Sequence, residues 1–387
     1  MDSDGVLTNP SEDVVVKPCT PAEVAFYESA NVSHRDFAYF MPDFMGTLQL
    51  GAPSSVNLSD QPTPSVTTAS NIPSVTNLKA FNLPTTHAPS TSIPPDSLTA
   101  ETEITDLRAI NQPPTHPPST LTPPSGALHD PVPLKGKKLE TDLHIVLQNI
   151  AGGFKHPNIL DLKLGARLWA DDAKPDKRAR LDKVSGETTS GSLGFRIAGM
   201  RVWQGTQSCS GKPENGVDKM HAALDPSTNV LSYNKLYGRM FNADNVIDAF
   251  REYLLVPSAG VDRGMAHSIT SNFLREVIEI RDILQSEESR MYSASILLVY
   301  EGDPVAWKEA TKAVEIAREA MLEKVGNEGS DTDDDVEDEV ELKPFAIKLI
   351  DFAHATWTPG MGPDTNMLQG VKSTIKILEQ LEVELST

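Results

Sequence analysis

The chain has few cysteines, no long apolar run and no leader-like start. Its only cysteines, Cys19 and Cys209, lie in separate segments without metal-ligand spacing, so we expect a reducing compartment and no disulfide framework. No apolar stretch approaches the roughly 20 residues that a membrane-spanning helix needs. The first ten residues lack the charged and apolar regions of a signal peptide. These absences predict a soluble intracellular protein that does not bind membranes.

Positive charge is also scarce. The chain holds 34 Lys and Arg against 54 Asp and Glu, a formal net charge of -20. Nucleic-acid-binding proteins usually present a basic face, so we expect no direct nucleic-acid binding. Residues 328–341 carry nine acids and no base, and removing these nine from the net charge of -20 still leaves -11. Any site for an anion must therefore be made by local clustering of Lys and Arg.

Two stretches have compositions that do not favour a packed core. Residues 51–135 hold 16 of the 29 prolines, with abundant Ser and Thr and no sustained periodicity, and such a segment cannot offset its chain entropy by burial. Residues 326–343 contain the acidic tract, whose like charges repel. We predict that both are disordered insertions. Both suit the binding of protein partners, and tolerated loops without partners are the alternative.

The remaining segments predict an α+β fold with two lobes and a cleft between them. The N-lobe is assigned to residues 1–50 and 136–150, and the C-lobe to residues 151–387. Thr20, Pro21 and Glu23 form the start signal of a helix to Ala30. Patterns elsewhere predict a hairpin at 5–17, a turn and strand within 37–50, strands at 143–148, 197–203, 294–300 and 345–352, helices from 175 and at 242–255, 272–285, 305–325 and 364–385, and a loop at 232–239.

The most unusual chemistry lies between residues 156 and 203. Asp161 and Lys163 are two apart on an extended segment, so their side chains point to the same side. Five cations then follow between residues 174 and 183. On a helix starting at Pro175, three of them spread over about 120° of one face, namely Lys177, Arg180 and Lys183. A local cationic pocket on an anionic protein predicts a polyanionic ligand.

Other candidate residues carry little information singly. Asp351 ends an apolar strand, where a carboxylate can hold Mg²⁺ on ATP phosphates, and a turn residue is the alternative. Ser295 alone would be a core hydroxyl and His354 a packing or capping histidine. Lys17 alone would be a solvating charge at the end of a strand. Only their combination indicates a function.

The combined motifs resemble those of the inositol polyphosphate kinase family. They are the Pro-x-x-x-Asp-x-Lys-x-Gly run at 157–165, the strand motif at 295–298 and Ile-Asp-Phe at 350–352. Further similarity lies at 16–17, 23–27, 194–195, 199–202 and 351–354, and the resemblance covers about residues 5–50, 140–300 and 345–384. Residues 177–181 are most similar to fungal inositol polyphosphate multikinases. Among enzymes, inositol hexakisphosphate kinases are the alternative. Outside enzymes, the alternative is a non-catalytic, transcription-linked scaffold of the same fold.

The resemblance implies a two-lobed kinase-like fold, ATP and Mg²⁺ as cofactors, and phosphoryl transfer to inositol tris- and tetrakisphosphate. Lys17 matches the lysine that holds the ATP phosphates, and Asp161 a residue that bonds the ribose. The segment from Gln148 to Ile150 matches the hinge that takes adenine through backbone groups. The family also implies a location in the nucleus with some cytoplasm.

The resemblance also assigns catalytic and substrate residues. Lys163 matches the residue between the acceptor hydroxyl and the γ-phosphate, and Asp351 the Mg²⁺ ligand; both are expected to be catalytic. His354 matches a contact to the inositol ring. The substrate phosphates are expected to bind Lys163 together with Lys177, Arg180, Lys183 and Arg201.

Three features depart from the family pattern. The chain begins almost inside its first hairpin, whereas the family has a short Gly-containing segment before it that covers the phosphates. The strand motif has Ile296 in place of a second serine, which removes one hydroxyl. The hinge has Gln148 and Asn149 where acidic residues are common, and backbone contacts to adenine should survive that change.

Overall fold

The computed structural model describes residues 6–9, 12–49, 141–206, 221–325 and 343–387. These residues belong to one unit, formed by 1–54 and 135–387. The predicted insertions at 51–135 and 326–343 lie outside the described residues, apart from Lys343. None of the helices in the described ranges combines the length and the apolar character needed to span a bilayer.

The N-terminal part contains a four-stranded antiparallel sheet in the order β1-β2-β4-β3. Its strands are β1 (Leu7–Thr8), β2 (Val14–Pro18), β4 (Leu143–Gln148) and β3 (Phe44–Gln49). The pairing of β1 with β2 confirms the predicted hairpin. Because β4 lies between β2 and β3, the chain returns to this sheet after residue 140 to complete it.

Two helices follow β2. Helix α1 (Pro21–Ser33) begins as predicted, with the Thr20 hydroxyl accepting a hydrogen bond from the Glu23 amide at 3.2 Å. Helix α2 (Arg35–Tyr39) was not predicted, since a turn and a strand were expected within 37–50. Its single fully buried side chain, Phe37, packs against aromatic rings of α1 and of the C-terminal part. This long-range packing carries no local sequence signal.

The larger part is built on a six-stranded antiparallel sheet in the order β11-β10-β5-β6-β8-β7. The strands are β11 (Phe345–Ile350), β10 (Ser295–Glu301), β5 (Pro157–Leu164), β6 (Phe195–Trp203), β8 (Val230–Tyr233) and β7 (Ala222–Asp225). A further pair joins β9 (Ser289–Met291) to β12 (Ala355–Trp357). This mixed part and the β-rich N-terminal part confirm the predicted α+β fold with a small N-lobe and a larger C-lobe.

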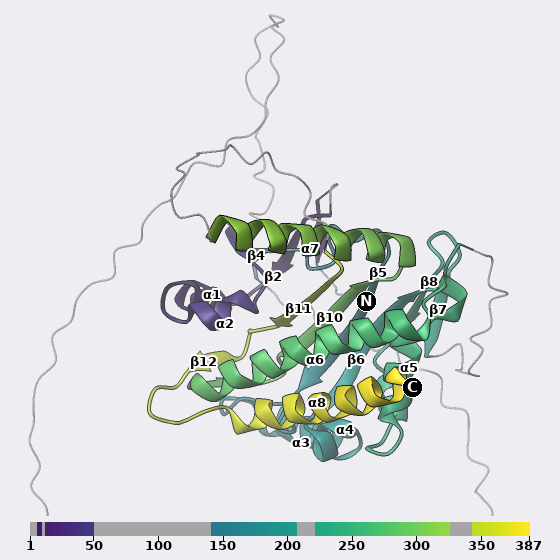
Figure 1. Cartoon of the computed structure of the whole chain (residues 1–387). Helices are drawn as coiled ribbons and strands as arrows, with labels where there is room; N and C mark the ends of the chain where they lie inside the picture. The colour runs from purple at the N-terminus through teal and green to yellow at the C-terminus, as the bar shows by residue number, and fades with distance from the viewer. Residues whose placement is uncertain (1–5, 10–11, 50–140, 207–220, 326–342) are drawn as a thin grey trace, which may run out of the picture. The chain divides into compact units, whose positions relative to one another are not determined.

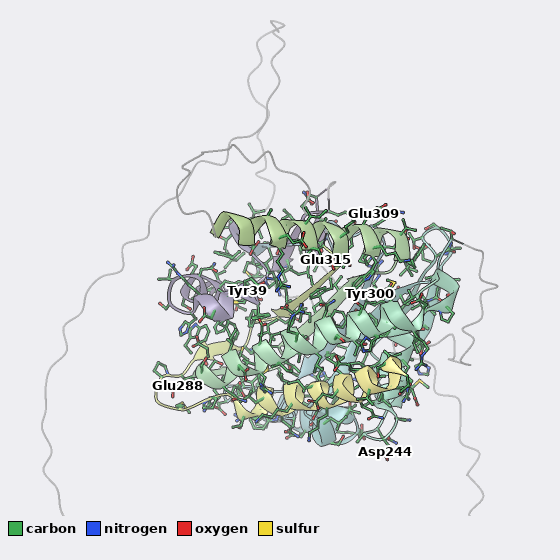
Figure 2. All side chains as sticks on the ribbon, in the orientation of Figure 1. Tyr39, Asp244, Glu288, Tyr300, Glu309 and Glu315 are labelled. Atoms are coloured by element: carbon green, nitrogen blue, oxygen red, sulfur yellow. The ribbon has the colours of Figure 1, made fainter. Side chains whose placement is uncertain are left out.

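Helices α6 (Arg263–Ser286) and α8 (Thr365–Ser386) run side by side across one face of the larger sheet (Figure 1). Apolar side chains of both helices and of alternate strand positions form the main core. Helix α7 (Pro304–Val325) runs along the top of the view, above α6 and α8, and carries Glu309 and Glu315 (Figure 2). Tyr300, on β10, lies in the core. The hydroxyl of Tyr300 donates to the Tyr253 carbonyl at 2.7 Å, so even this polar atom is satisfied within the core.

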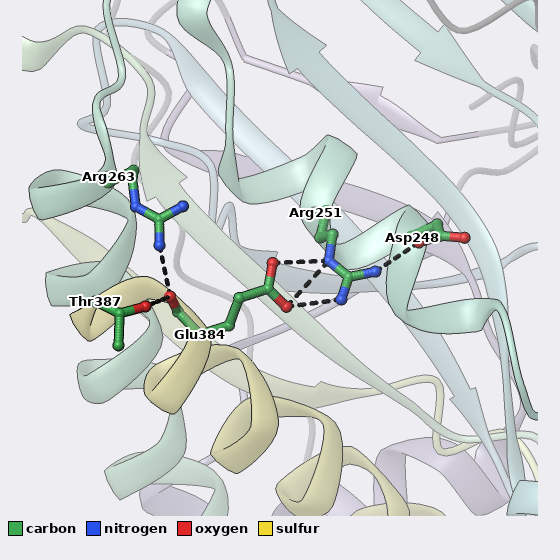
Figure 3. Close-up of polar contacts among 5 residues, drawn as sticks. All are labelled: Asp248, Arg251, Arg263, Glu384 and Thr387. Carbon is green, nitrogen blue, oxygen red and sulfur yellow. Dashed lines mark hydrogen bonds and ion pairs between the residues drawn. The ribbon is translucent and has the colours of Figure 1, made fainter.

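Helix α5 (Val246–Leu254) is tied to the end of α8 by an ion-pair network (Figure 3). Nη2 of Arg251 lies 2.6 Å from Oε2 of Glu384, and its Nη1 lies 2.6 Å from Asp248. Arg263, at the start of α6, donates to the Glu384 carbonyl at 2.5 Å. Three helices are therefore joined at the end of the chain.

Some predicted elements were wrong in kind or extent. The predicted loop at 232–239 contains the end of β8 and most of a 3-10 helix, η1 (Tyr237–Met240). The hydroxyls of Tyr233 and Tyr237 both donate to the Glu252 carboxylate on α5, a contact that local patterns do not reveal. Helix α6 starts nine residues before the predicted position, where Asp262 caps it by accepting from the Met265 amide at 2.8 Å. Helix α5 is shorter than predicted.

A glycine on α8 sets how closely this helix approaches the segments around Lys163. A Cβ added at Gly370 would lie 2.3 Å from the carbonyl oxygen of Gly194 and 2.9 Å from a Leu164 methyl carbon. Gly370→Ala is expected to lower the free energy of unfolding by about 1–3 kcal/mol because the close contact forces a backbone shift. Denaturant unfolding measures this change. Gly186→Ala, at a helical glycine with open space around it, is the control and should not destabilise; equal losses would contradict the prediction.

Candidate functional site

Two lysines from different parts of the chain converge on Asp351. Nζ of Lys17, on β2, lies 3.1 Å from Oδ1 of Asp351, and Nζ of Lys163, on β5, lies 3.7 Å from its Oδ2. Asp351 itself follows the last residue of β11. A carboxylate bracketed by two ammonium groups is thus assembled from three strands that are distant in sequence.

Lys17 is also fixed by a second carboxylate. Its Nζ lies 3.0 Å from Oε1 of Glu23, which is buried in the first turn of α1. Burial lowers the pKa of Lys17, but the carboxylates of Asp351 and Glu23 outweigh this effect and raise it. The ammonium is therefore held cationic in a defined place. A strand lysine paired with a helix glutamate is the arrangement with which protein kinases hold ATP phosphates.

The backbone at Asp351 is unusual. Its φ of 69° lies in the left-handed region, which costs an L-residue about 1–2 kcal/mol. Burial raises the pKa of its carboxyl, but Lys17 and Lys163 outweigh this and hold the pKa below the ordinary value for Asp. Strained residues of this kind cluster at functional sites, and here the strain presents an ionised carboxylate to both lysines.

Asp161 and Ser295 add oxygen atoms on the same face of the sheet. On β10, Ser295 pairs with Lys163 and Leu297 pairs with Asp161, so the three polar side chains share a face. Oδ1 of Asp161 and Oγ of Ser295 are buried, and neither makes a well-formed hydrogen bond with the described residues, although the Ser295 hydroxyl is near enough to lower the pKa of Asp161. Burial raises the pKa of Asp161, Lys163 opposes this, and the nearby Asp351 adds to it. Buried oxygens normally have partners, so these atoms are suited to a ligand.

Lys163 is oriented by a carbonyl. Its Nζ donates to the carbonyl oxygen of Ser293 at 2.6 Å. Ser293 has a φ of 64°, a second non-glycine residue in the left-handed region beside the site. The ammonium thus has one fixed partner and faces Asp351 with its remaining donors.

Arg196 is a second cation beside Lys163 that sequence reasoning missed. It pairs with Lys163 across β5 and β6, and its Nη1 donates to the Ser190 hydroxyl at 3.0 Å. Burial and the guanidinium of Arg239 lower the pKa of Arg196 to about 10. The Arg196 side chain therefore remains cationic at neutral pH. A bound anion would offset the repulsion between the guanidiniums of Arg196 and Arg239.

Helix α3 (Pro175–Gly186) brings one of its predicted cations to the site. Nζ of Lys177 lies 3.5 Å from Nε2 of His354, three residues beyond Asp351. Burial and the Lys177 ammonium lower the pKa of His354, so its imidazole is neutral near pH 7. Both residues are placed to contact a ligand that reaches Lys163.

The structure does not bring the other predicted substrate residues to this cluster. Lys183 pairs with Glu187 at 3.8 Å on the exposed side of α3, where Arg180 is also exposed. Arg201, on β6, pairs with Ile159 on β5 and is exposed. In the part of the chain that the structure describes, none of these three cations has a hydrogen bond or ion pair with Lys163, Asp351 or His354.

The predicted hinge contains an apolar cluster. The Gln148 amide, at the end of β4, donates to the Asp43 carbonyl at 2.9 Å. Ile150 packs with three apolar side chains, namely Phe154, Ile159 and Val299. Because Ile159 lies two residues before Asp161 on β5, this cluster and the polar site share one face of the sheet.

A family profile described as "Inositol polyphosphate kinase" matches residues 144–379, more than half of the chain. The chain belongs to the inositol polyphosphate kinase family. It is therefore a kinase that transfers phosphoryl groups from ATP to inositol phosphates. The matched region runs from β4 through most of α8 and includes Lys163 and Asp351. Lys17 precedes the matched region, but it lies on β2 and pairs with Ile145 on β4, inside that region.

Individual members of the family show different degrees of similarity. The inositol polyphosphate multikinase of Saccharomyces cerevisiae is 34% identical over 260 residues, which cover 64% of this chain and 70% of that protein. The inositol hexakisphosphate kinase 1 of Rattus norvegicus is 29% identical over 249 residues, covering 62% and 52%. The chain thus spans about half the length of that second kinase. A crystal structure of the S. cerevisiae multikinase in complex with ADP and Mn²⁺ covers 62% of this chain and 83% of its own, with 34% identity and a TM-score of 0.49.

The kinase site contains residues whose role sequence reasoning overlooked. Glu23 was used as a helix-start signal and as part of the family resemblance, without a role in the site, yet it fixes Lys17. Its position between the strand lysine and the Phe26-Tyr27 pair was a usable signal, because the family resemblance included it. Arg196 gave no such signal, since its place opposite Lys163 depends on an irregular strand pairing.

Proposed function

We propose that this chain is an inositol polyphosphate multikinase, which transfers the γ-phosphoryl group of ATP to hydroxyls of inositol tris- and tetrakisphosphate. The observation that carries the proposal is the Lys17–Asp351–Lys163 arrangement, with Arg196 and Lys177 on the Lys163 side. The higher identity to a multikinase, 34% against 29% for a hexakisphosphate kinase, supports the choice of substrate.

The residues at Asp351 fit a magnesium ion that is bound together with a nucleotide. Carboxylate oxygens are ligands that Mg²⁺ prefers, and Asp351 supplies one, with the Ser295 hydroxyl on the neighbouring strand. No group of three or more His, Cys, Asp or Glu in the described ranges could hold a metal by itself, so phosphate oxygens would complete the coordination. The bound ion would neutralise charge on the β- and γ-phosphates.

The same residues define where ATP would lie. Lys17, held by Glu23, would bind its phosphates. The unpartnered Oδ1 of Asp161 would accept a hydrogen bond from a ribose hydroxyl. The apolar cluster around Ile150 would contact adenine, with backbone groups of Gln148 to Ile150 bonding its edge. ATP would thus extend from the end of β4, past β5, to the end of β11.

The inositol phosphate would lie on the other side of Lys163. Its reacting hydroxyl would sit by the Lys163 ammonium, and its phosphates would meet Arg196, Lys177 and the neutral His354. Several cations at short range are needed to bind a ligand with several phosphates. Arg180, Lys183 and Arg201 stay proposed contacts to more distant phosphates. The protein would act by positioning and by stabilising charge, with no covalent intermediate.

A substrate panel tests this proposal. The full chain is incubated with ATP, Mg²⁺ and, separately, inositol tris-, tetrakis- and hexakisphosphate, and the products are separated by charge. Conversion of tris- and tetrakisphosphate is expected. Conversion of hexakisphosphate alone would overturn the multikinase assignment in favour of pyrophosphate synthesis.

The proposed location is the nucleus and cytoplasm, and the proposed protein partners bind residues 51–135 and 326–343. The composition of the two segments supports the partner proposal. Imaging of the tagged chain tests the location. Partner capture with and without each segment tests the binding regions, and unchanged capture after both deletions would refute them.

A further inference from the structure

Helix α3 carries the predicted substrate cations but has little apolar surface to hold it in place. Ser185 is its only buried residue, and Leu181 and Val184 are half-buried. Its N-cap residue, Lys174, makes no side-chain cap. Burial of apolar side chains, which fixes most helices, therefore contributes little here, and polar contacts must decide where Lys177 lies.

Trp169, in the loop between β5 and α3, makes two of those contacts; further ones join Arg178 to the carbonyls of Asp171 and Ala173 and the Ser185 hydroxyl to the Ala166 carbonyl. The guanidinium carbon of Arg167 lies 4.0 Å from the centroid of the Trp169 ring, and that of Arg178, on α3, lies 4.7 Å from it. The indole Nε1 donates to Oδ1 of Asp182, also on α3, at 2.6 Å. Arg178 and Asp182 are one helical turn apart, so a single side chain contacts α3 at two points.

The loop that carries Trp169 is itself tied to the kinase site. The backbone amide and carbonyl of Arg167 are bonded by the Asn366 side chain at 2.8 and 3.0 Å. The Ser293 hydroxyl donates to the Leu168 carbonyl at 3.0 Å, and the Ser293 carbonyl accepts from Lys163. A continuous series of contacts therefore runs from Lys163 through Ser293 to the loop, and through Trp169 to α3.

We propose that Trp169 is a positioning residue for substrate binding. It fixes α3 against residues 165–174, so that Lys177 stays beside His354 and facing the phosphates of the inositol substrate. The identity of that substrate rests on the proposed function, whereas the attachment of α3 does not. Two cations over one indole supply an attraction that a purely apolar side chain of similar size cannot.

Kinetics of the full chain separate positioning from general damage. Trp169→Leu is expected to raise KM for inositol trisphosphate about tenfold while KM for ATP stays within about twofold. Trp169→Phe keeps a ring beneath both guanidiniums but loses the bond to Asp182, so it should restore part of the affinity. Tyr39→Leu removes a different ring with a cation over it, Lys348 at 5.1 Å, and should change neither constant. Equal increases in both KM values, or no increase, would overturn the proposal.

Amide hydrogen exchange tests the attachment without any substrate. In Trp169→Leu the amides of residues 175–186 should exchange faster than in the wild-type chain, while those of α8 stay protected. Trp169→Phe, which keeps the ring and loses the bond to Asp182, should show an intermediate rate. Unchanged exchange in α3 would refute the positioning role. If the wild-type chain phosphorylates no inositol phosphate, the proposed function fails, and the exchange result still decides whether Trp169 holds α3.

Discussion

Lys163→Met is expected to lower kcat by about 10²–10³-fold, the usual cost of removing one preorganised group that stabilises transition-state charge. The Lys163 ammonium is held 2.6 Å from the Ser293 carbonyl and 3.7 Å from Asp351, so no reorganisation is needed when charge develops on the transferred phosphoryl group. Methionine keeps the length of the side chain and fills its space. Single-turnover kinetics with saturating ATP and inositol trisphosphate measure the effect on the chemical step.

The control for this prediction is a lysine outside the site. Lys372 is exposed on α8, and Lys372→Met should leave kcat unchanged. Both variants should unfold at temperatures close to that of the wild-type chain. Near-normal turnover of a folded Lys163→Met protein would remove the role assigned to this lysine.

Asp351→Asn is expected to reduce turnover by at least about 10²-fold and also to destabilise the fold. Asparagine adopts the left-handed backbone of this position more readily than most residues, so the change isolates the charge. The two lysines lower the pKa of Asp351, which means that folding favours the ionised carboxylate. This stabilisation is complete above the ordinary pKa of Asp and is lost as the pH falls through the lower pKa of the folded state. Thermal unfolding across that range measures it.

Asp161→Asn is the matched comparison, and its effect on thermal stability at pH 7 is expected to have the opposite sign. Burial raises the pKa of Asp161, so the folded state disfavours its ionised form and a neutral amide should raise the melting temperature at pH 7. This gain should shrink as the pH falls through the raised pKa and vanish below the ordinary one. Turnover should still fall, because the proposed ribose contact is weakened. A change in melting temperature at pH 7 with the same sign in Asp161→Asn and Asp351→Asn would contradict this account of the two carboxylates.

Local signals in the sequence were sufficient for much of the fold. The helix start at Thr20 and Pro21 was predicted from a cap, a proline and an acid that act within one turn. Asp161 and Lys163 were placed on one side because strand side chains alternate, and the two residues do share a face. These predictions succeeded because each depends on residues that are close in the chain.

The composition of the kinase site was decided by contacts between distant segments. Strict alternation along β6 would put Arg196 and Arg201 on opposite faces, and the family resemblance had assigned only Arg201 to the substrate. The irregular pairing between Asp161 and Leu162 leaves Ala198 unpaired on β6 and turns Arg196 toward Lys163. Lys17, on β2 of the N-terminal sheet, meets Asp351, which follows β11 of the larger sheet, across 334 residues of sequence.

The sequence by itself therefore determined the family, the α+β class and the segments that carry the motifs, because those depend on local pattern and residue order. Which cations face Lys163, how Glu23 holds Lys17 and how Trp169 holds α3 were decided by tertiary structure alone. Strand register and the direction in which a side chain points depend on how the whole core packs, even for residues as near in the sequence as Lys17 and Glu23, and local patterns do not contain that information.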